Sequence, residues 1–197
     1  AGLLAVAAVT IGIETRASRP DLASGPVVPG LHETIGGGRR ITITSSDASY
    51  RIERAQRGAE NVWVMRDRGD YPVLSARLAQ LTRGLEQLQF TRRMSTDPAK
   101  FDRLGVGDPR HGGRGVLVQI EDARGALLVN LILGTIPTAG QNVFYVRRPD
   151  QNQTWAAQGP LPPLRDVASW LNLRPLDIPV ESVEHVEITP AQGRGYV

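Results

Sequence analysis

Two apolar, strand-like runs joined by a short turn constrain the fold more than any other feature of this chain. Residues 115–121 and 126–133 are rich in Val, Leu and Ile, and residues 122–125 between them read Asp-Ala-Arg-Gly. A short turn of this composition between two such runs is typical of a β-hairpin. The chain is therefore expected to contain an antiparallel sheet built around this hairpin.

Further strands are expected on both sides of the hairpin. Ile41 and Ile43 alternate with threonines, and Tyr50 and Ile52 alternate with charged residues, which is the period of a half-buried strand. Apolar composition extends the series at residues 61–66, 142–148, 153–157 and 186–188. No strand–helix–strand alternation appears, so the pattern favours antiparallel over parallel pairing.

One helix is strongly indicated by leucine spacing. Five leucines recur at intervals of four and three residues up to about Gln89, which places them on one helix face: Leu74, Leu78, Leu81, Leu85 and Leu88. A short helix is expected over 98–104, with Asp97 as its N-cap, and a second over 164–173. The predicted fold class is α+β. It is an antiparallel sheet of about seven to eight strands in meander or hairpin order, with the leucine-rich helix and a second shorter helix packed on it.

The N-terminal residues favour an anchored domain. Residues 1–13 are apolar and uncharged, too short alone for the roughly 20 residues that cross a bilayer. The chain does not begin with Met, so we expect them to be the remnant of a longer membrane anchor or signal segment. The alternative is a buried element of a soluble domain. Residues 14–38 have the composition of a flexible linker, although Arg16 and Arg19 argue mildly against this orientation.

The expected domain organisation follows from these segments. The α+β domain covers residues 39–180. Residues 181–197 echo the strand and tyrosine pattern of residues 40–50, so we expect them to begin a truncated second repeat unit.

Charge does not indicate a nucleic-acid partner. The net charge is +3, but the arginines are interleaved with acidic residues, and Lys100 is the one lysine. A nucleic-acid interface needs clustered basic residues. We therefore expect no nucleic acid among the partners.

The residues of common catalytic and metal sites are absent or scattered. The chain has no cysteine, and its histidines, His32, His111 and His185, share no ligand spacing. No nucleophile elbow and no phosphate-binding loop occur. We expect no catalytic residue, no cofactor and no bound metal.

The remaining candidates for a ligand or partner site are aromatic and cationic. Tryptophans can stack on a sugar or fill a partner's groove, and paired arginines can hold an anion. The alternatives are a buried core position for each tryptophan and a solvated helix end for the arginines. The candidate residues are Trp63, Trp155, Trp170, Arg92 and Arg93.

The order of several short motifs resembles a bacterial domain-of-unknown-function family, number 4340, over roughly residues 40–190. The motifs are Leu133-Gly134, Tyr145-Val146-Arg147, Trp155, Trp170 and Asp177-Ile178-Pro179. The resemblance implies an accessory role, because members often appear beside export-type ABC transporters and gliding-type accessory proteins.

Three function classes follow. The first is a membrane-tethered interaction module without catalysis, with protein partners in a membrane complex such as ABC transporter subunits. It would be a single-pass protein of the bacterial inner membrane, held through its N-terminal segment, with the domain facing the periplasm. The second is a glycan- or lipid-binding module, which a groove lined by two tryptophans and an arginine would favour. The third is an enzyme, which a cleft with a perturbed acid would favour.

Overall fold

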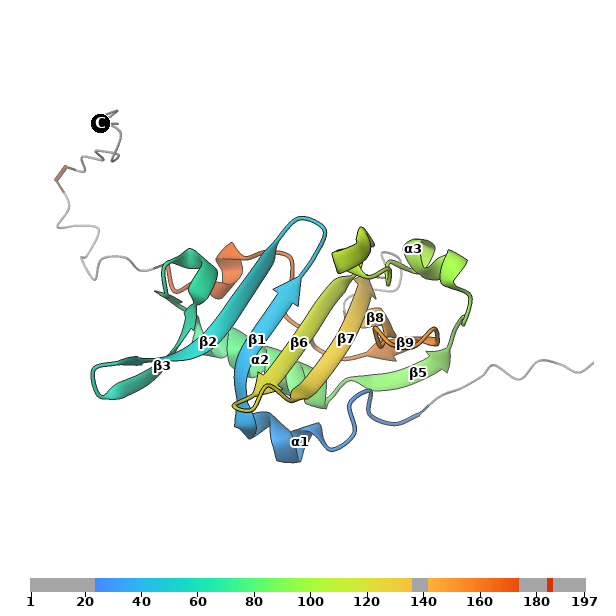
Figure 1. Cartoon of the computed structure of the whole chain (residues 1–197), viewed down its shortest axis with the longest axis horizontal. Helices are drawn as coiled ribbons and strands as arrows, with labels where there is room; N and C mark the ends of the chain where they lie inside the picture. The colour runs from blue at the N-terminus through green and yellow to red at the C-terminus, as the bar shows by residue number, and fades with distance from the viewer. Residues whose placement is uncertain (1–23, 136–141, 174–183, 186–197) are drawn as a thin grey trace, which may run out of the picture.

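The described residues form one nine-stranded antiparallel sheet in the order β4-β3-β2-β1-β6-β7-β8-β9-β5 (Figure 1). The computed structural model describes residues 24–135, 142–173 and 184–185. The strands are β1 (Gly38–Thr44), β2 (Ser49–Arg57), β3 (Glu60–Met65), β4 (Tyr71–Pro72), β5 (Gln89–Arg93), β6 (Val116–Asp122), β7 (Leu127–Thr135), β8 (Val143–Arg147) and β9 (Thr154–Gln158). The predicted β6–β7 hairpin is confirmed, with Val118 opposite Leu131.

The helices are short apart from one. They are α1 (Leu31–Thr34), α2 (Ser75–Glu86) and α3 (Phe101–Leu104), with 3-10 turns at Ile35–Gly37, Arg66–Arg68, Pro98–Lys100, Pro109–His111 and Ala168–Trp170. The expected helix over 98–104 is formed by a 3-10 turn that runs into α3, and the Asp97 side chain accepts a hydrogen bond from the amide of Ala99, as an N-cap does.

The main core lies between one face of the sheet and α2, which runs behind the strands in Figure 1. Leu78, Leu81 and Leu85 of α2 are buried, which confirms the helix face that leucine spacing predicted. The alternate residues Ile41 and Ile43 of β1 pack against them from the sheet. Burial of this apolar surface is the main source of the fold's stability.

A second, smaller core covers part of the other sheet face, where α3 lies near the top of Figure 1. Leu104 and Val106 pack on Leu117 and Ile132 of the central strands. A side chain at Gly134 would place its Cβ atom 2.3 Å from the carbonyl oxygen of Leu104. Glycine is therefore needed where the α3 segment crosses β7.

The strand count corrects the prediction of seven to eight strands. The two unpredicted strands, β4 and β5, are the edges of the sheet. Strand β5 carries Arg92 and Arg93, which we expected at a helix end. Both arginines are exposed, so this strand lacks the apolar alternation that indicates inner strands.

The predicted helix over 164–173 is wrong, since only the 3-10 turn Ala168–Trp170 forms there. Backbone groups of this segment form hydrogen bonds with another part of the chain. The carbonyl of Trp170 accepts a hydrogen bond from the amide of Leu74, and the amide of Asn172 donates to the carbonyl of Pro72. Pairing with the β4–α2 connection replaces the internal bonds of a helix.

The expected linker over 14–38 is packed where the structure describes it. Residues 24–37, here called the strap, contribute to the main core beside α2, and Val27 and Leu31 are 1% and 2% exposed. The amide of Phe90 donates to the carbonyl of Gly25, so the strap also pairs with the outer edge of β5. The folded unit therefore includes the strap, whereas the remaining division into domains stays a prediction.

Other expectations lie outside the described residues. These are the anchor segment 1–13, the strand at 186–188 and most of the repeat at 181–197. In the part of the chain that the structure describes, no helix has the length and apolarity to cross a bilayer.

Candidate functional site

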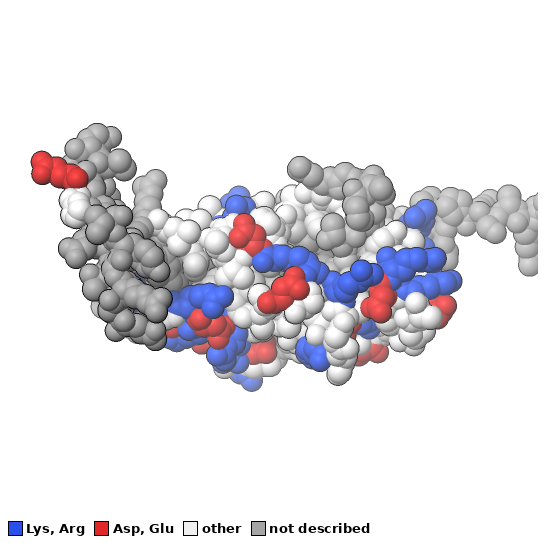
Figure 2. Space-filling model, turned by 90° about the horizontal axis from the view of Figure 1, so that it is seen from above, with Lys and Arg blue, Asp and Glu red and all other residues white. Residues whose placement is uncertain are grey.

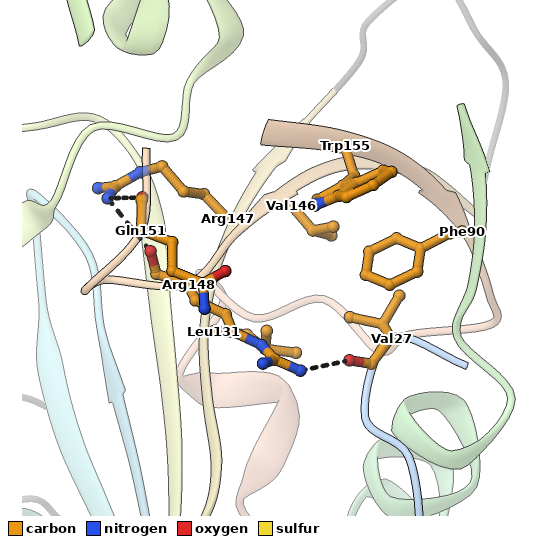
Figure 3. Close-up of a pocket in the computed structure, with 8 residues that line it drawn as sticks. All are labelled: Val27, Phe90, Leu131, Val146, Arg147, Arg148, Gln151 and Trp155. Atoms are coloured by element: carbon orange, nitrogen blue, oxygen red, sulfur yellow. Dashed lines mark hydrogen bonds between the residues drawn. The ribbon is translucent and has the colours of Figure 1, made fainter. Parts of the chain in front are cut away.

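Of the recesses among the described residues, two are lined by a tryptophan, and both open on the helix-covered side of the sheet. The first, here called the Trp155 recess, has a volume of ≈ 170 Å³ and lies where β7, β8, β9 and β5 meet the strap (Figure 3). Its lining residues are Val27, Phe90, Leu131, Val146, Arg147, Arg148, Gln151 and Trp155.

An aromatic pair forms the wall of the Trp155 recess. The ring centroids of Phe90 and Trp155 lie 4.7 Å apart at an interplanar angle of 38°. Arg93 is paired with Trp155 across β5 and β9, and its guanidinium carbon lies 5.7 Å from the indole centroid. Arg93 Nε also donates to Gln153 Oε1 at 2.7 Å. The indole thus contacts both a phenyl ring and a cation, and these contacts favour its observed orientation.

The two arginines after β8 have different roles. Arg147 is 5% exposed, and in Figure 3 its guanidinium points away from the recess. It donates to the backbone carbonyls of Val106, Arg148, Pro149 and Gln151. Burial lowers the pKa of Arg147, but the carbonyl ring keeps the cation hydrogen-bonded. Its role is structural.

Arg148 lies at the rim of the Trp155 recess. Its side chain is exposed, and Nη2 makes one long contact of 3.4 Å with the carbonyl oxygen of Val27. Figure 3 shows Arg148 reaching across the recess toward the strap. It places a cation at the edge of this apolar hollow.

The second recess, here called the Trp63 recess, lies between α2, the strap and the β2–β3 hairpin. It has a volume of ≈ 270 Å³. Ile35, Ile41, Leu78 and Ile120 contribute apolar lining. The guanidinium carbon of Arg54 lies 5.2 Å from the centroid of the Trp63 ring.

The structure separates the predicted site residues. Trp63 and Trp155 line different recesses, so the groove with two tryptophans and an arginine does not form. Trp170 is fully buried beside Tyr50 and donates through its indole nitrogen to the carbonyl of Pro163. Arg92 pairs with Ala156, on the sheet face opposite Trp155.

Sequence reasoning missed Val27, Phe90 and Arg54 as site residues. Val27 lay in the expected linker, and Phe90 in a strand that was not predicted. Arg54 could have been found from strand pairing, because it lies directly opposite Trp63 in the β2–β3 hairpin.

Ion pairs link β1 to its neighbours β2 and β6. Glu53 accepts hydrogen bonds from Arg40 and Arg66, and Arg40 also bonds Glu121. These bonds, that from Arg40 first, hold the pKa of Glu53 below its usual value. Figure 2 accordingly shows Lys and Arg interleaved with Asp and Glu on the face it presents. Among the described residues no group of three or more His, Asp or Glu side chains is placed to hold a metal ion.

Comparison with known proteins gives one match. A family model described as "Domain of unknown function (DUF4340)" matches residues 63–197, which is more than half of the chain. No curated protein and no solved structure matches the chain.

Proposed function

This chain belongs to the DUF4340 family, as the order of its strand and tryptophan motifs predicted, and we propose that it acts as a membrane-tethered interaction module without catalysis. In this proposal its N-terminal segment holds it in the bacterial inner membrane. The domain faces the periplasm and serves as an accessory part of a membrane complex, such as one containing ABC transporter subunits.

The Trp155 recess is the observation that carries the proposal. Pockets for small-molecule ligands usually span about 300–1,000 Å³, whereas this recess has ≈ 170 Å³. Such a hollow suits one apolar side chain of a partner protein. Tryptophan and arginine are also the residues that dominate binding energy at protein interfaces.

The rim indicates what the partner presents. The apolar lining favours an apolar side chain inside the recess, while Arg148 at the rim favours an acidic neighbour. The apolar lining residues are Val27, Phe90, Leu131 and Val146. The preferred partner segment therefore carries an apolar residue next to Asp or Glu.

The strap supports a position close to the membrane. The strap enters the domain beside β5, and Val27 lines the recess itself. If residues 1–13 end in the bilayer, the residues from 13 to 24 span at most about 40 Å when fully extended. The tether would hold the Trp155 recess within reach of membrane partners and raise their effective concentration.

Fractionation with protease access tests the location. The full-length protein in its bacterial host should sediment with the inner membrane. Its domain should be cut by protease added to spheroplasts but not to intact cells. Recovery in the soluble cytoplasmic fraction would contradict the tethered placement. Crosslinking from the recess, described below, tests the interaction.

A further inference from the structure

We propose that the Trp63 recess binds a single-chain anionic amphiphile, an acyl chain that ends in a carboxylate or a phosphate. The proposal is independent of the protein-binding role assigned to the Trp155 recess. It rests on an apolar interior beside two arginines that have no carboxylate partner among the described residues.

The interior of the Trp63 recess is apolar. Ile41 and Ile120 form the floor on the sheet, Leu78 and Ala79 of α2 form one wall, and Ile35 of the strap closes another. The hydroxyl of Thr82, which also lines the recess, donates within its own helix to the carbonyls of Leu78 and Ala79. The recess therefore has few groups free to bond sugar hydroxyls, and an apolar chain suits it better than a glycan.

The mouth of the recess is cationic. Arg54 also lines an adjoining polar hollow that contains Arg39 and Arg40. Arg40 is paired with Glu53 and Glu121, whereas neither Arg39 nor Arg54 forms an ion pair or a side-chain hydrogen bond with a described residue. An anionic head group placed here would meet two guanidinium groups without a carboxylate partner among the described residues, and guanidinium groups bind carboxylates and phosphates with good geometry.

The acidic groups in the same hollow do not compete for these arginines. Glu53 accepts from Arg40 and Arg66. Asp122 accepts from the backbone amides of Arg124 and Ala126, which hold its pKa below the usual value. Arg40 is matched by Glu53 and Glu121. The cations of the hollow without a carboxylate partner among the described residues are therefore Arg39 and Arg54, and these two complement an anion.

The size of the recess sets the number of chains. Its volume of ≈ 270 Å³ lies just under the usual lower bound of about 300 Å³ for small-molecule pockets. It fits a single short chain or the end of a longer one. A diacyl lipid would have to leave its second chain in solvent.

Calorimetric titration of the full chain with four decyl probes below their micelle concentrations tests the proposal. Decanoate and decyl phosphate should bind, while decanol should bind at least about tenfold more weakly, because it lacks the charge-assisted hydrogen bonds of the anions. Decyltrimethylammonium should not bind. Equal binding of decanol and decanoate, or no binding of either anion, would overturn the proposal.

Three variants locate the binding. Arg54→Glu should weaken decanoate binding by about tenfold or more, and Ala79→Phe should abolish it by filling the recess. Arg103→Glu makes the same charge change on the exposed surface of α3 and should bind as the parent does. Each variant's melting curve checks its folding. If Ala79→Phe is unstable, Arg54→Glu still tests the proposal, because the Arg54 side chain is exposed.

Vesicles of phosphatidylglycerol distinguish the source of the anionic chain. Binding to vesicles without binding of decanoate would show a membrane-surface contact and overturn a single-chain site. Binding of decanoate that persists in both Arg54→Glu and Ala79→Phe would place the ligand elsewhere and overturn the proposal as well.

Discussion

The backbone amide of Val27 donates a hydrogen bond of 2.8 Å to the carbonyl oxygen of Leu88, which joins the strap to the end of the leucine-rich helix. The carbonyl of Val27 in turn accepts the contact from Arg148 at the rim of the Trp155 recess. One residue of the strap thus connects α2, the edge of the sheet and the proposed interaction site. The strap is part of the module that a partner would contact.

Removing a buried side chain of the strap should destabilise the whole domain. Leu31→Ala is expected to lower the free energy of unfolding by about 2–5 kcal/mol, the usual cost for a buried leucine, because Leu31 is 2% exposed. Chemical denaturation measures this. Glu33→Ala, at an exposed position of the same short helix, is the matched control and should change little. A Leu31→Ala curve that overlaps the parent would show that the strap is not core.

Gly134 should not tolerate even a methyl group. Gly134→Ala would bring a Cβ atom to 2.3 Å from the carbonyl oxygen of Leu104. The α3 segment must then shift, at a cost of about 1–3 kcal/mol for an overpacked site. Gly37→Ala, where a Cβ meets no atom within 4 Å, serves as the control in thermal denaturation. Equal melting temperatures for the two variants would argue against close packing of α3 on β7.

Arg147 should be needed for folding rather than for binding. Arg147→Met removes the donor that serves four backbone carbonyls. The expected loss is at least about 1–3 kcal/mol, the cost of leaving a buried polar group unpaired. Arg148→Met should leave the unfolding free energy almost unchanged, since that side chain is exposed. If Arg148→Met lowers the free energy of unfolding more than Arg147→Met does, Arg147 does not have the structural role assigned to it.

Acid should weaken the fold partly through Glu53. Hydrogen bonds from Arg40, and then from Arg66, hold the pKa of Glu53 below its usual value. The stabilisation is therefore complete above the unfolded pKa of about 4.3 and is lost as the pH falls through the lower folded value. Glu53→Gln should flatten this acid limb of the stability curve. Glu60→Gln, which removes an exposed carboxylate without an ion pair among the described residues, should follow the parent. Identical limbs for all three proteins would exclude the proposed linkage.

Periodicity predicted the elements that have a clear apolar face. The leucine face of α2 and the inner strands β6 and β7 could be read because burial imposes a period on their residues. Strand β5 could not be predicted from periodicity, because at the edge of the sheet Arg92 and Arg93 can face solvent. The predicted helix over 164–173 does not form for another reason. Hydrogen bonds of its backbone with Leu74 and Pro72 override the local helix propensity.

The candidate site was only partly accessible from sequence. Aromatic and cationic composition selected Trp155 and Arg93, which do meet across β5 and β9. The same reasoning could not distinguish these two residues from Trp170, which is buried in the core. Phe90 and Val27 join the recess through contacts between segments far apart in the chain, and such contacts have no local signal.

Photo-crosslinking in the native bacterial host tests the interaction module most directly. The full-length protein would carry a benzoylphenylalanine at Gln151, an exposed residue at the rim of the Trp155 recess. The same probe at Glu60, on the distant β2–β3 hairpin, is the control position. We predict an adduct with a membrane protein from Gln151 and none from Glu60. The adduct should be lost in Trp155→Ala and kept in Trp63→Ala. No adduct from Gln151, or an adduct that survives Trp155→Ala, would contradict the proposed function.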